Sequence, residues 1–210
     1  MRISGGIAKG RRVGLKKAFA KKGETDELRP TSAKVRQAIF NILGNILGDK
    51  IVGSRFLDLY AGTGAVGIEA LSRGAGKTVF VDDNSLRVNI IKELLEKFGF
   101  KDRAVVIKDD AKHFLKKITP NSKLQTRDFF DIIFVDPPYA SGELDMVLPL
   151  IDEKAILVDN GIVIAEHSTK KAPPFTSPLD KGGTRGVGSL RLIKTYKYGD
   201  TSLTLYRKER

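Results

Sequence analysis

The sequence predicts an α/β fold: a mostly parallel sheet with helices on both faces, closed at its carboxyl-terminal end by an antiparallel hairpin. Three observations lead to this prediction. From Arg55 onward, strand-like and helix-like stretches alternate. Four of the strand-like stretches end near an acidic residue, at intervals of 24, 28 and 26 residues, which is the length of one strand-plus-helix unit. The segment 189–208 departs from the pattern, with two strand-like runs around "YGD", a hairpin signal.

The elements can be assigned in order along the chain. The stretch "RPTSAKVRQAIFNIL" predicts a first helix whose N-terminus is capped by Thr31 or Ser32. Its core-facing residues recur at helical spacing: Val35, Ile39, Ile42, Leu43 and Ile46. Strands are then expected at 55–60, 78–82, 104–108, 130–136 and 161–166. Helices are expected near 66–73, 86–98, 111–118 and 143–151. This alternation implies parallel strands joined by right-handed crossovers.

The net charge of +12 lies at the two ends of the chain. Residues 1–36 carry a balance of +8 and residues 167–210 one of +7, whereas residues 37–166 carry −3. We interpret residues 1–28 as a basic arm or short hairpin that precedes a domain over 29–210. Clustered basic charge indicates a polyanion-binding surface, although a solubilising tail is the alternative. The predicted nucleic-acid contacts are Arg2, Lys9, Arg11, Arg12, Lys16 and Lys17.

Composition excludes several classes of protein. The chain has no cysteine and only two histidines, far apart in sequence, so neither a disulfide framework nor a metal site is expected. No apolar run approaches the roughly 18 residues of a membrane span. The basic N-terminus lacks the apolar core of a signal peptide, and a cytoplasmic protein is expected. Residues 172–189 contain three prolines and four glycines without hydrophobic periodicity, which predicts a mobile loop insertion.

A glycine-rich turn follows the first strand in "FLDLYAGTGAVGIEA". Gly62, Gly64 and Gly67 form G-x-G-x-x-G, which fits NAD-binding folds and lets backbone N–H groups approach a ligand. Asp58 argues against NAD, because a carboxylate there would repel a pyrophosphate but attract an ammonium group. A tight turn with glycines used only for packing is the structural alternative.

Two further acids extend the predicted ligand site. Asp82 ends the second strand, where a carboxylate suits the two hydroxyls of a ribose. Asp110 can accept a hydrogen bond from an adenine amine, although its position also suits a helix N-cap. An adenosine with a charged amino-acid tail is S-adenosylmethionine, which we predict as the cofactor.

The fourth strand ends in "FVDPPYASG". The exocyclic amine of a base is a poor nucleophile because its lone pair is delocalised into the ring. The carboxylate of Asp136 and a backbone carbonyl held by Pro137 can accept both amine hydrogens and so make the lone pair available. The ring of Tyr139 can stack on an extruded base. The pattern therefore predicts methylation of a base amine.

The chain resembles the RsmD family of 16S ribosomal RNA guanine-N2 methyltransferases, which are Rossmann-like class I enzymes dependent on S-adenosylmethionine. The resemblance runs through "RISGGIAKGRRV", "LRPTSAKVRQAIFNIL", "FLDLYAGTGAVGIEALSRGA", "FVDPPY" and "KYGDTSLTLYRK". It implies a set of cofactor contacts: Arg29, Thr31, Asp58, Gly62, Thr63, Gly64, Asp82 and Asp110. It assigns the target guanine to Asp136, Pro137 and Tyr139. The chain departs from the family in carrying Asp82 where glutamate is usual, and in a longer loop before the hairpin.

Other functions remain open at this point. A DNA adenine-N6 methyltransferase could use the same "DPPY" chemistry, although the arm followed by "RPT" favours an RNA enzyme. An NAD-dependent oxidoreductase leaves "DPPY" and the basic ends unexplained. A non-catalytic nucleic-acid-binding protein would bind RNA without turnover. The expected partner is ribosomal RNA in the small subunit or its assembly intermediate, and a monomer is expected.

Overall fold

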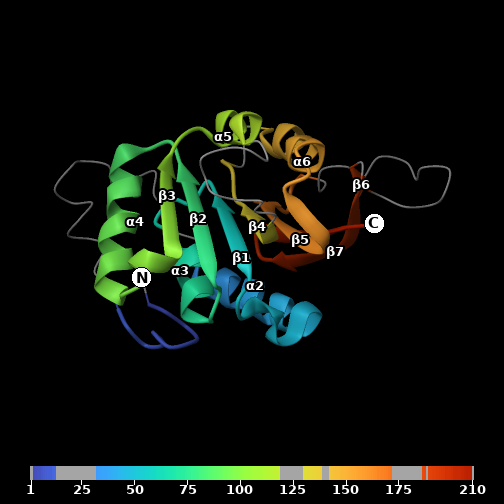
Figure 1. Ribbon diagram of the computed structural model, residues 1–210. Coiled ribbons are helices and arrows are strands. Elements are labelled where there is room, and N and C mark those ends of the chain that lie inside the picture. The colour runs from blue at the N-terminus through green and yellow to red at the C-terminus, as the bar shows by residue number, and fades with distance from the viewer. Residues whose placement is uncertain are drawn as a thin grey trace. The chain divides into compact units, whose positions relative to one another are not determined.

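The computed structural model describes residues 2–12, 32–118, 130–138, 142–171, 186–187 and 189–209. The chain divides into two compact units, Met1–Lys108 and Asp109–Arg210. Figure 1 labels the helices and strands. The predicted boundary between residues 28 and 29 lies outside the described residues.

The first unit is built on three parallel strands in the order β3–β2–β1. The strands are β1 (Arg55–Leu59), β2 (Lys77–Asp82) and β3 (Ala104–Lys108). The helices are α2 (Ala33–Leu47), α3 (Ala65–Ser72) and α4 (Ser85–Phe98), with short 3-10 helices at Gly48–Ile51 and Lys101–Arg103. The predicted strands and helices of this region are confirmed, with ends that differ by at most one residue.

The first predicted helix is confirmed as α2, with two differences in its core-facing side. Ser32 is its N-cap, and the Ser32 hydroxyl accepts a hydrogen bond from the Val35 N–H at 3.1 Å. Ile46 was expected in the core but is half-exposed, because it lies in the last turn of the helix. Arg36, a charged residue, is instead buried.

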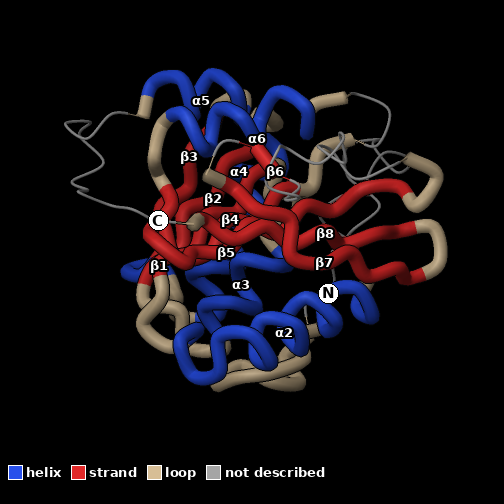
Figure 2. Tube along the Cα trace, turned by 90° about the vertical axis from the view of Figure 1, so that its right-hand side faces the viewer, coloured by secondary structure: helices blue, strands red, loops and turns tan. Residues whose placement is uncertain are grey.

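The second unit pairs its strands in the order β4–β5–β8–β7–β6. Its elements are α5 (Ala111–Lys117), β4 (Phe130–Val135), α6 (Leu144–Glu153), β5 (Leu157–Ser168), β6 (Gly186–Val187), β7 (Leu190–Tyr198) and β8 (Thr201–Lys208). β4 and β5 are parallel, while β8 is antiparallel to both β5 and β7. The predicted carboxyl-terminal hairpin is therefore confirmed (Figure 2).

The end of the second unit differs from the prediction in two places. β5 was expected at 161–166 but begins at Leu157, because Phe130 pairs with Leu157 across a register shift in β4. Gly186–Val187, expected within a loop, pair with the first residues of β7 as strand β6. Ser189 then bonds the carboxylate of Asp152 through both its N–H and its hydroxyl. Residues 172–185 and 188 of the predicted loop lie outside the described residues.

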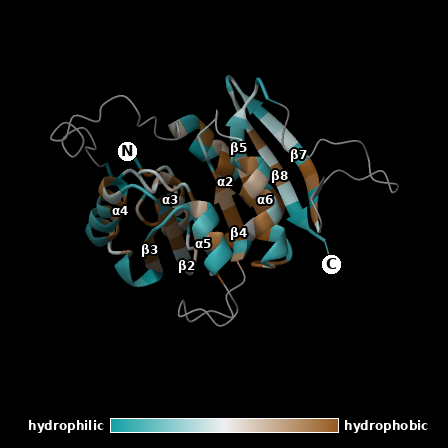
Figure 3. Ribbon diagram, turned by 90° about the horizontal axis from the view of Figure 1, so that it is seen from above, coloured by the Kyte–Doolittle hydropathy of each residue, from teal (hydrophilic) through white to brown (hydrophobic). Residues whose placement is uncertain are grey.

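Burial follows the apolar runs of the central strands. β4 reads as a nearly continuous hydrophobic run, and it is coloured hydrophobic along most of its length in Figure 3. Such runs are typical of parallel strands that are covered on both faces. In the first unit, Phe56, Leu57 and Phe80 are fully buried. Within the described part of the chain, no helix is long and apolar enough to cross a membrane.

Candidate functional site

Asp58 lies in β1 and is almost fully buried, 1 % exposed. Its Oδ2 atom accepts a hydrogen bond from the Gly67 N–H at 2.9 Å, so the carboxyl group faces the start of α3. Burial raises the pKa of the Asp58 carboxyl to about 8; the hydrogen bond from Gly67 opposes this effect, and the nearby Asp82 adds to it. A cation placed beside Asp58 would stabilise its ionised form.

Asp82 ends β2, as predicted, and is also buried. Its Oδ2 accepts the Gly62 N–H at 2.7 Å, and its Oδ1 accepts the Asn84 N–H at 3.0 Å. The Arg87 guanidinium lies 3.8 Å from Oδ1. Burial raises the pKa of Asp82, and these hydrogen bonds and Arg87 oppose the rise. Asp82 therefore ties the glycine turn to the end of the neighbouring strand, while each oxygen retains a second lone pair for a ligand hydroxyl.

The glycines of the turn are needed for different physical reasons. Gly62 has φ +56°, and among the described residues a Cβ added there would have one atom within 4 Å, the Tyr60 carbonyl oxygen at 3.9 Å. The backbone at Gly62 is thus open to a ligand, but its conformation disfavours other residues. The position of Gly67 has no space for a side chain, because a Cβ would lie 2.3 Å from the Phe80 ring and 2.9 Å from Asp58 Oδ2. Gly67 is required for packing α3 against the sheet and for its bond to Asp58.

The remaining turn residues continue into α3. Thr63 is buried, and Gly64 is the N-cap of α3 in the left-handed conformation, φ +70°. Among the described residues, no side chain caps this helix end by a hydrogen bond. The turn therefore presents a helix N-terminus beside two buried carboxyl groups, an arrangement that can receive a ligand carrying both an anionic and a cationic group.

Residues 2–12 form a compact loop that is docked onto α3 in the same unit. Arg2 and Arg12 pair in an antiparallel bridge, and the Ile3 N–H donates to the Arg11 carbonyl at 3.0 Å. Ile3 and Ala8 are buried in a core cluster with Ile68 and Leu71. The predicted basic hairpin thus has an apolar inner side that belongs to the core of the first unit.

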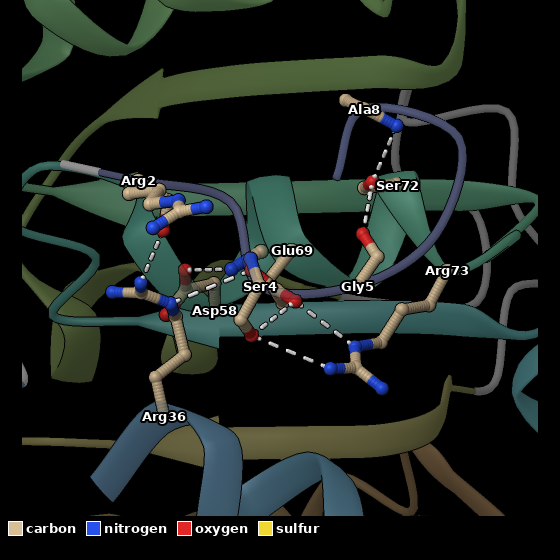
Figure 4. A network of polar contacts seen from close by, with 10 residues as sticks. Arg2, Ser4, Gly5, Ala8, Arg36, Asp58, Glu69, Ser72 and Arg73 are labelled. Atoms are coloured by element: carbon tan, nitrogen blue, oxygen red, sulfur yellow. Dashed lines mark hydrogen bonds and ion pairs between the residues drawn. The ribbon is translucent and has the colours of Figure 1, made fainter. Parts of the chain in front are cut away.

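Glu69 of α3 holds this loop by a network of polar contacts (Figure 4). Its carboxylate accepts the Ser4 N–H at 2.9 Å and the Ser4 hydroxyl at 2.7 Å. Two guanidinium groups balance its charge: Arg73 Nε at 3.0 Å and Arg36 Nε at 3.5 Å. Arg36 also donates to the Arg2 carbonyl at 2.6 Å. Burial lowers the pKa of Arg36, and the Glu69 carboxylate opposes that shift.

Sequence reasoning did not single out this network. The signal was present as one acid, Glu69, inside the otherwise small and apolar helix "AVGIEALS", with an arginine four residues later. Ser72 completes the docking: its hydroxyl donates to the Gly5 carbonyl at 2.6 Å and accepts the Ala8 N–H at 3.0 Å. The helix that begins at the glycine turn therefore also carries the amino-terminal loop.

The predicted basic contacts of this loop face outward. The side chains of Arg2, Lys9, Arg11 and Arg12 are exposed. Arg11 lies over the Phe98 ring, 5.8 Å from its centroid. Lys16 and Lys17 lie outside the described residues, as do Arg29 and Thr31.

In the second unit, Asp110 and Asp136 follow the ends of β3 and β4 in sequence. Asp110 is the N-cap of α5, and its Oδ1 accepts the His113 N–H at 3.0 Å. The N-cap alternative weighed for Asp110 is therefore confirmed, and its second oxygen is available to a ligand. Asp136 is half-exposed directly after β4, Pro137 is buried and Pro138 is exposed. Tyr139 lies outside the described residues.

The chain is similar to known proteins over nearly its whole length. The family model "Conserved hypothetical protein 95" matches residues 1–207. "Putative rRNA methyltransferase YlbH" of Bacillus subtilis is 35 % identical over 208 residues, covering 99 % of both chains. "Ribosomal RNA small subunit methyltransferase D" of Escherichia coli K12 is 33 % identical, covering 83 % of this chain and 78 % of its own.

Solved structures show the same architecture. "Putative methyltransferase yhhF" from Escherichia coli has a TM-score of 0.77 at 25 % identity, covering 100 % of this chain and 98 % of its own. An RNA methyltransferase from Salinibacter ruber, solved with S-adenosyl-L-homocysteine, shares the fold at 12 % identity, with a TM-score of 0.59 and coverage of 86 % and 94 %. The fold is thus that of the class I methyltransferases. With a family model over nearly its whole length and relatives above 30 % identity, the chain belongs to the RsmD family.

Proposed function

We propose that the protein transfers a methyl group from S-adenosylmethionine to the exocyclic N2 amine of a guanine in small-subunit ribosomal RNA. The observation that carries the proposal is the pair of buried carboxyl groups, Asp58 and Asp82, around a glycine turn that is open at Gly62. The names of the relatives support ribosomal RNA as the substrate.

The residues of the turn fit this cofactor. Asp58 is a buried acid whose ionisation is disfavoured until a cation approaches, and the methionine end of S-adenosylmethionine carries an ammonium group. The N-terminus of α3 suits the carboxylate of the same end. Asp82 has free lone pairs for the ribose hydroxyls, and Asp110 would accept the adenine amine. When bound, the cofactor supplies a methyl carbon on a positively charged sulfur.

The residues that would hold the methyl acceptor, the guanine, follow the end of β4. These residues would hold the guanine with its amine nitrogen facing the methyl group of the bound cofactor, and transfer would leave the sulfur as a neutral thioether and release one proton from the nitrogen. Asp136 accepts a hydrogen bond from the amine before transfer and can receive that proton. Pro137 fixes the backbone so that its carbonyl accepts the second amine hydrogen. Tyr139 would stack on the base.

Methyl transfer from radiolabelled S-adenosylmethionine tests the proposal. Small ribosomal subunits, naked 16S RNA and double-stranded DNA are offered in parallel, and the labelled nucleosides are identified after complete digestion. We expect N2-methylguanosine from RNA or its particle. Label in N6-methyladenine from DNA would contradict the proposal and favour the DNA enzyme. RNA binding without any transfer would favour the non-catalytic protein.

A further inference from the structure

The carboxyl-terminal hairpin and the end of β4 lie at the same edge of the sheet in the second unit. Val135 of β4 is registered with Ala165 of the parallel strand β5. Ser168, at the end of β5, pairs with Thr201 at the start of β8, and Thr201 pairs with Tyr198 at the end of β7. The turn of the hairpin therefore lies at the carboxyl ends of β4 and β5, where Asp136 follows β4.

Two tyrosines and two lysines lie in the last five residues of β7, next to this turn. Tyr196 and Tyr198 are two residues apart, so their side chains lie on the same face of the strand, and both are half-exposed. The Lys194 ammonium lies over the Tyr196 ring, 5.0 Å from its centroid. Lys197, between the two tyrosines in sequence, is exposed on the opposite face of the strand. An aromatic pair with a cation on the same face is typical of surfaces that bind single-stranded nucleic acid.

A second basic segment joins the same turn. The Thr169 N–H donates to the Asp200 carbonyl at 2.9 Å, which holds the residues after β5 beside the hairpin turn. Lys170 and Lys171 follow, and both are exposed. Among the described residues 168–171 and 194–201, four lysines are therefore accompanied by one acid, Asp200.

We propose that this end of the hairpin binds the single-stranded RNA that flanks the target guanine. The rings of Tyr196 and Tyr198 stack on bases, while Lys170 and Lys194 contact phosphates. The proposal rests on the proposed function and assigns it a second RNA surface, separate from the amino-terminal loop. It also accounts for the basic excess of residues 167–210, which the catalytic residues leave unexplained. The competing explanation is that lysines on β7 only protect an outer strand from pairing with other chains.

Binding of a fluorescently labelled, single-stranded RNA of mixed sequence to the full chain tests the surface without requiring activity. Fluorescence anisotropy gives the affinity, and thermal unfolding confirms that each variant is folded. We expect Tyr196→Ala and Tyr198→Ala each to weaken binding by about tenfold, because each removes one stacked base. Tyr196→Phe and Tyr198→Phe keep the ring and should bind within about twofold of the wild type.

The lysines are tested by the salt dependence of the same affinity. Lys194→Gln should reduce the slope of log affinity against log salt by about 0.7, the value for one phosphate contact on a single strand. The matched control is Lys101→Gln, an exposed lysine of the first unit paired with Glu96, which should leave the slope unchanged.

The outcomes separate this proposal from the proposed function. Unchanged RNA affinity in both folded alanine variants, or no measurable binding by the wild type, overturns the surface even if the wild type methylates RNA. Loss of binding in the alanine variants together with transfer only to DNA, or no transfer at all, overturns the proposed function but retains the surface.

Discussion

At the scale of single residues, Asp58 links the stability of the protein to its ligand site. Its pKa is about 8 in the folded chain and near 3.8 in the unfolded one, so the folded state retains a proton that the unfolded state has lost between these values. Stability from this group is therefore complete below pH 3.8 and decreases as pH rises toward 8. Asp58→Asn keeps an oxygen for the Gly67 N–H but cannot ionise. We expect its free energy of unfolding to exceed that of the wild type by on the order of 2 kcal/mol at about pH 8 and to match it near pH 4.

Urea unfolding of both proteins across this pH range measures the effect, with Asp102→Asn, at an exposed aspartate of the same unit, as the control that should change nothing. Affinity for S-adenosylhomocysteine should move in the opposite direction. The amide of the Asp58→Asn variant has no charge to offer an ammonium group, so binding should weaken by about 10- to 100-fold. A variant that is neither more stable at the alkaline end of the range nor weaker in binding would remove Asp58 from the cofactor site.

Substitutions of Asp136 test the part of the site that would hold the guanine. Asp136→Ala removes a directed hydrogen-bond acceptor, which typically costs on the order of 100- to 1,000-fold in rate. Asp136→Asn keeps one acceptor oxygen but adds a competing donor, and its rate should fall between those of the wild type and the alanine variant. Single-turnover methyl transfer and cofactor affinity are measured together. Near-normal turnover in Asp136→Ala would leave the "DPPY" segment as a rigid strand end only.

At the scale of elements, α3 connects the glycine turn to the amino-terminal loop through Glu69. Glu69→Gln leaves the buried Arg36 and the partly buried Arg73 without their shared counter-charge. Removing one partner of a buried ion pair typically costs about 3–5 kcal/mol. We expect a loss of this size in chemical denaturation, with early proteolysis within residues 2–12. The matched control is Glu96→Gln, whose pair with Lys101 is exposed and should contribute less than about 1 kcal/mol. Equal losses in the two variants would show that Glu69 does not anchor the loop.

The same elements show which features of the structure could be predicted from the sequence alone. Alternating apolar runs and turn residues predicted the strands and helices of both units, because local periodicity reports which face is buried. The docking of residues 2–12 was not predictable in this way, since it depends on contacts of Ser4 with Glu69 and of Gly5 with Ser72, and the partners of each contact are 65 or more residues apart. The buried Arg36 was missed for the same reason, because its partner lies on another helix. Of the candidate site, Asp58, Asp82 and the glycines are placed as predicted around one turn, whereas their binding roles stay predictions.

At the scale of the whole molecule, the net charge of +12 makes association with RNA dependent on salt. Deleting the amino-terminal residues would not test this dependence, because Ile3 and Ala8 belong to the core and their loss would destabilise the first unit.

Lys9→Gln with Arg12→Gln is a cleaner change, since both side chains are exposed and Arg12 joins the loop through its backbone bridge. We expect unchanged stability, unchanged affinity for S-adenosylhomocysteine, and a salt slope for RNA binding lower by about 1–2. Anisotropy titrations from low to physiological salt measure the slope, and Lys101→Gln again serves as the control. A slope equal to that of the wild type would mean that the loop does not contact phosphates, and that the basic charge which binds RNA lies elsewhere on the chain.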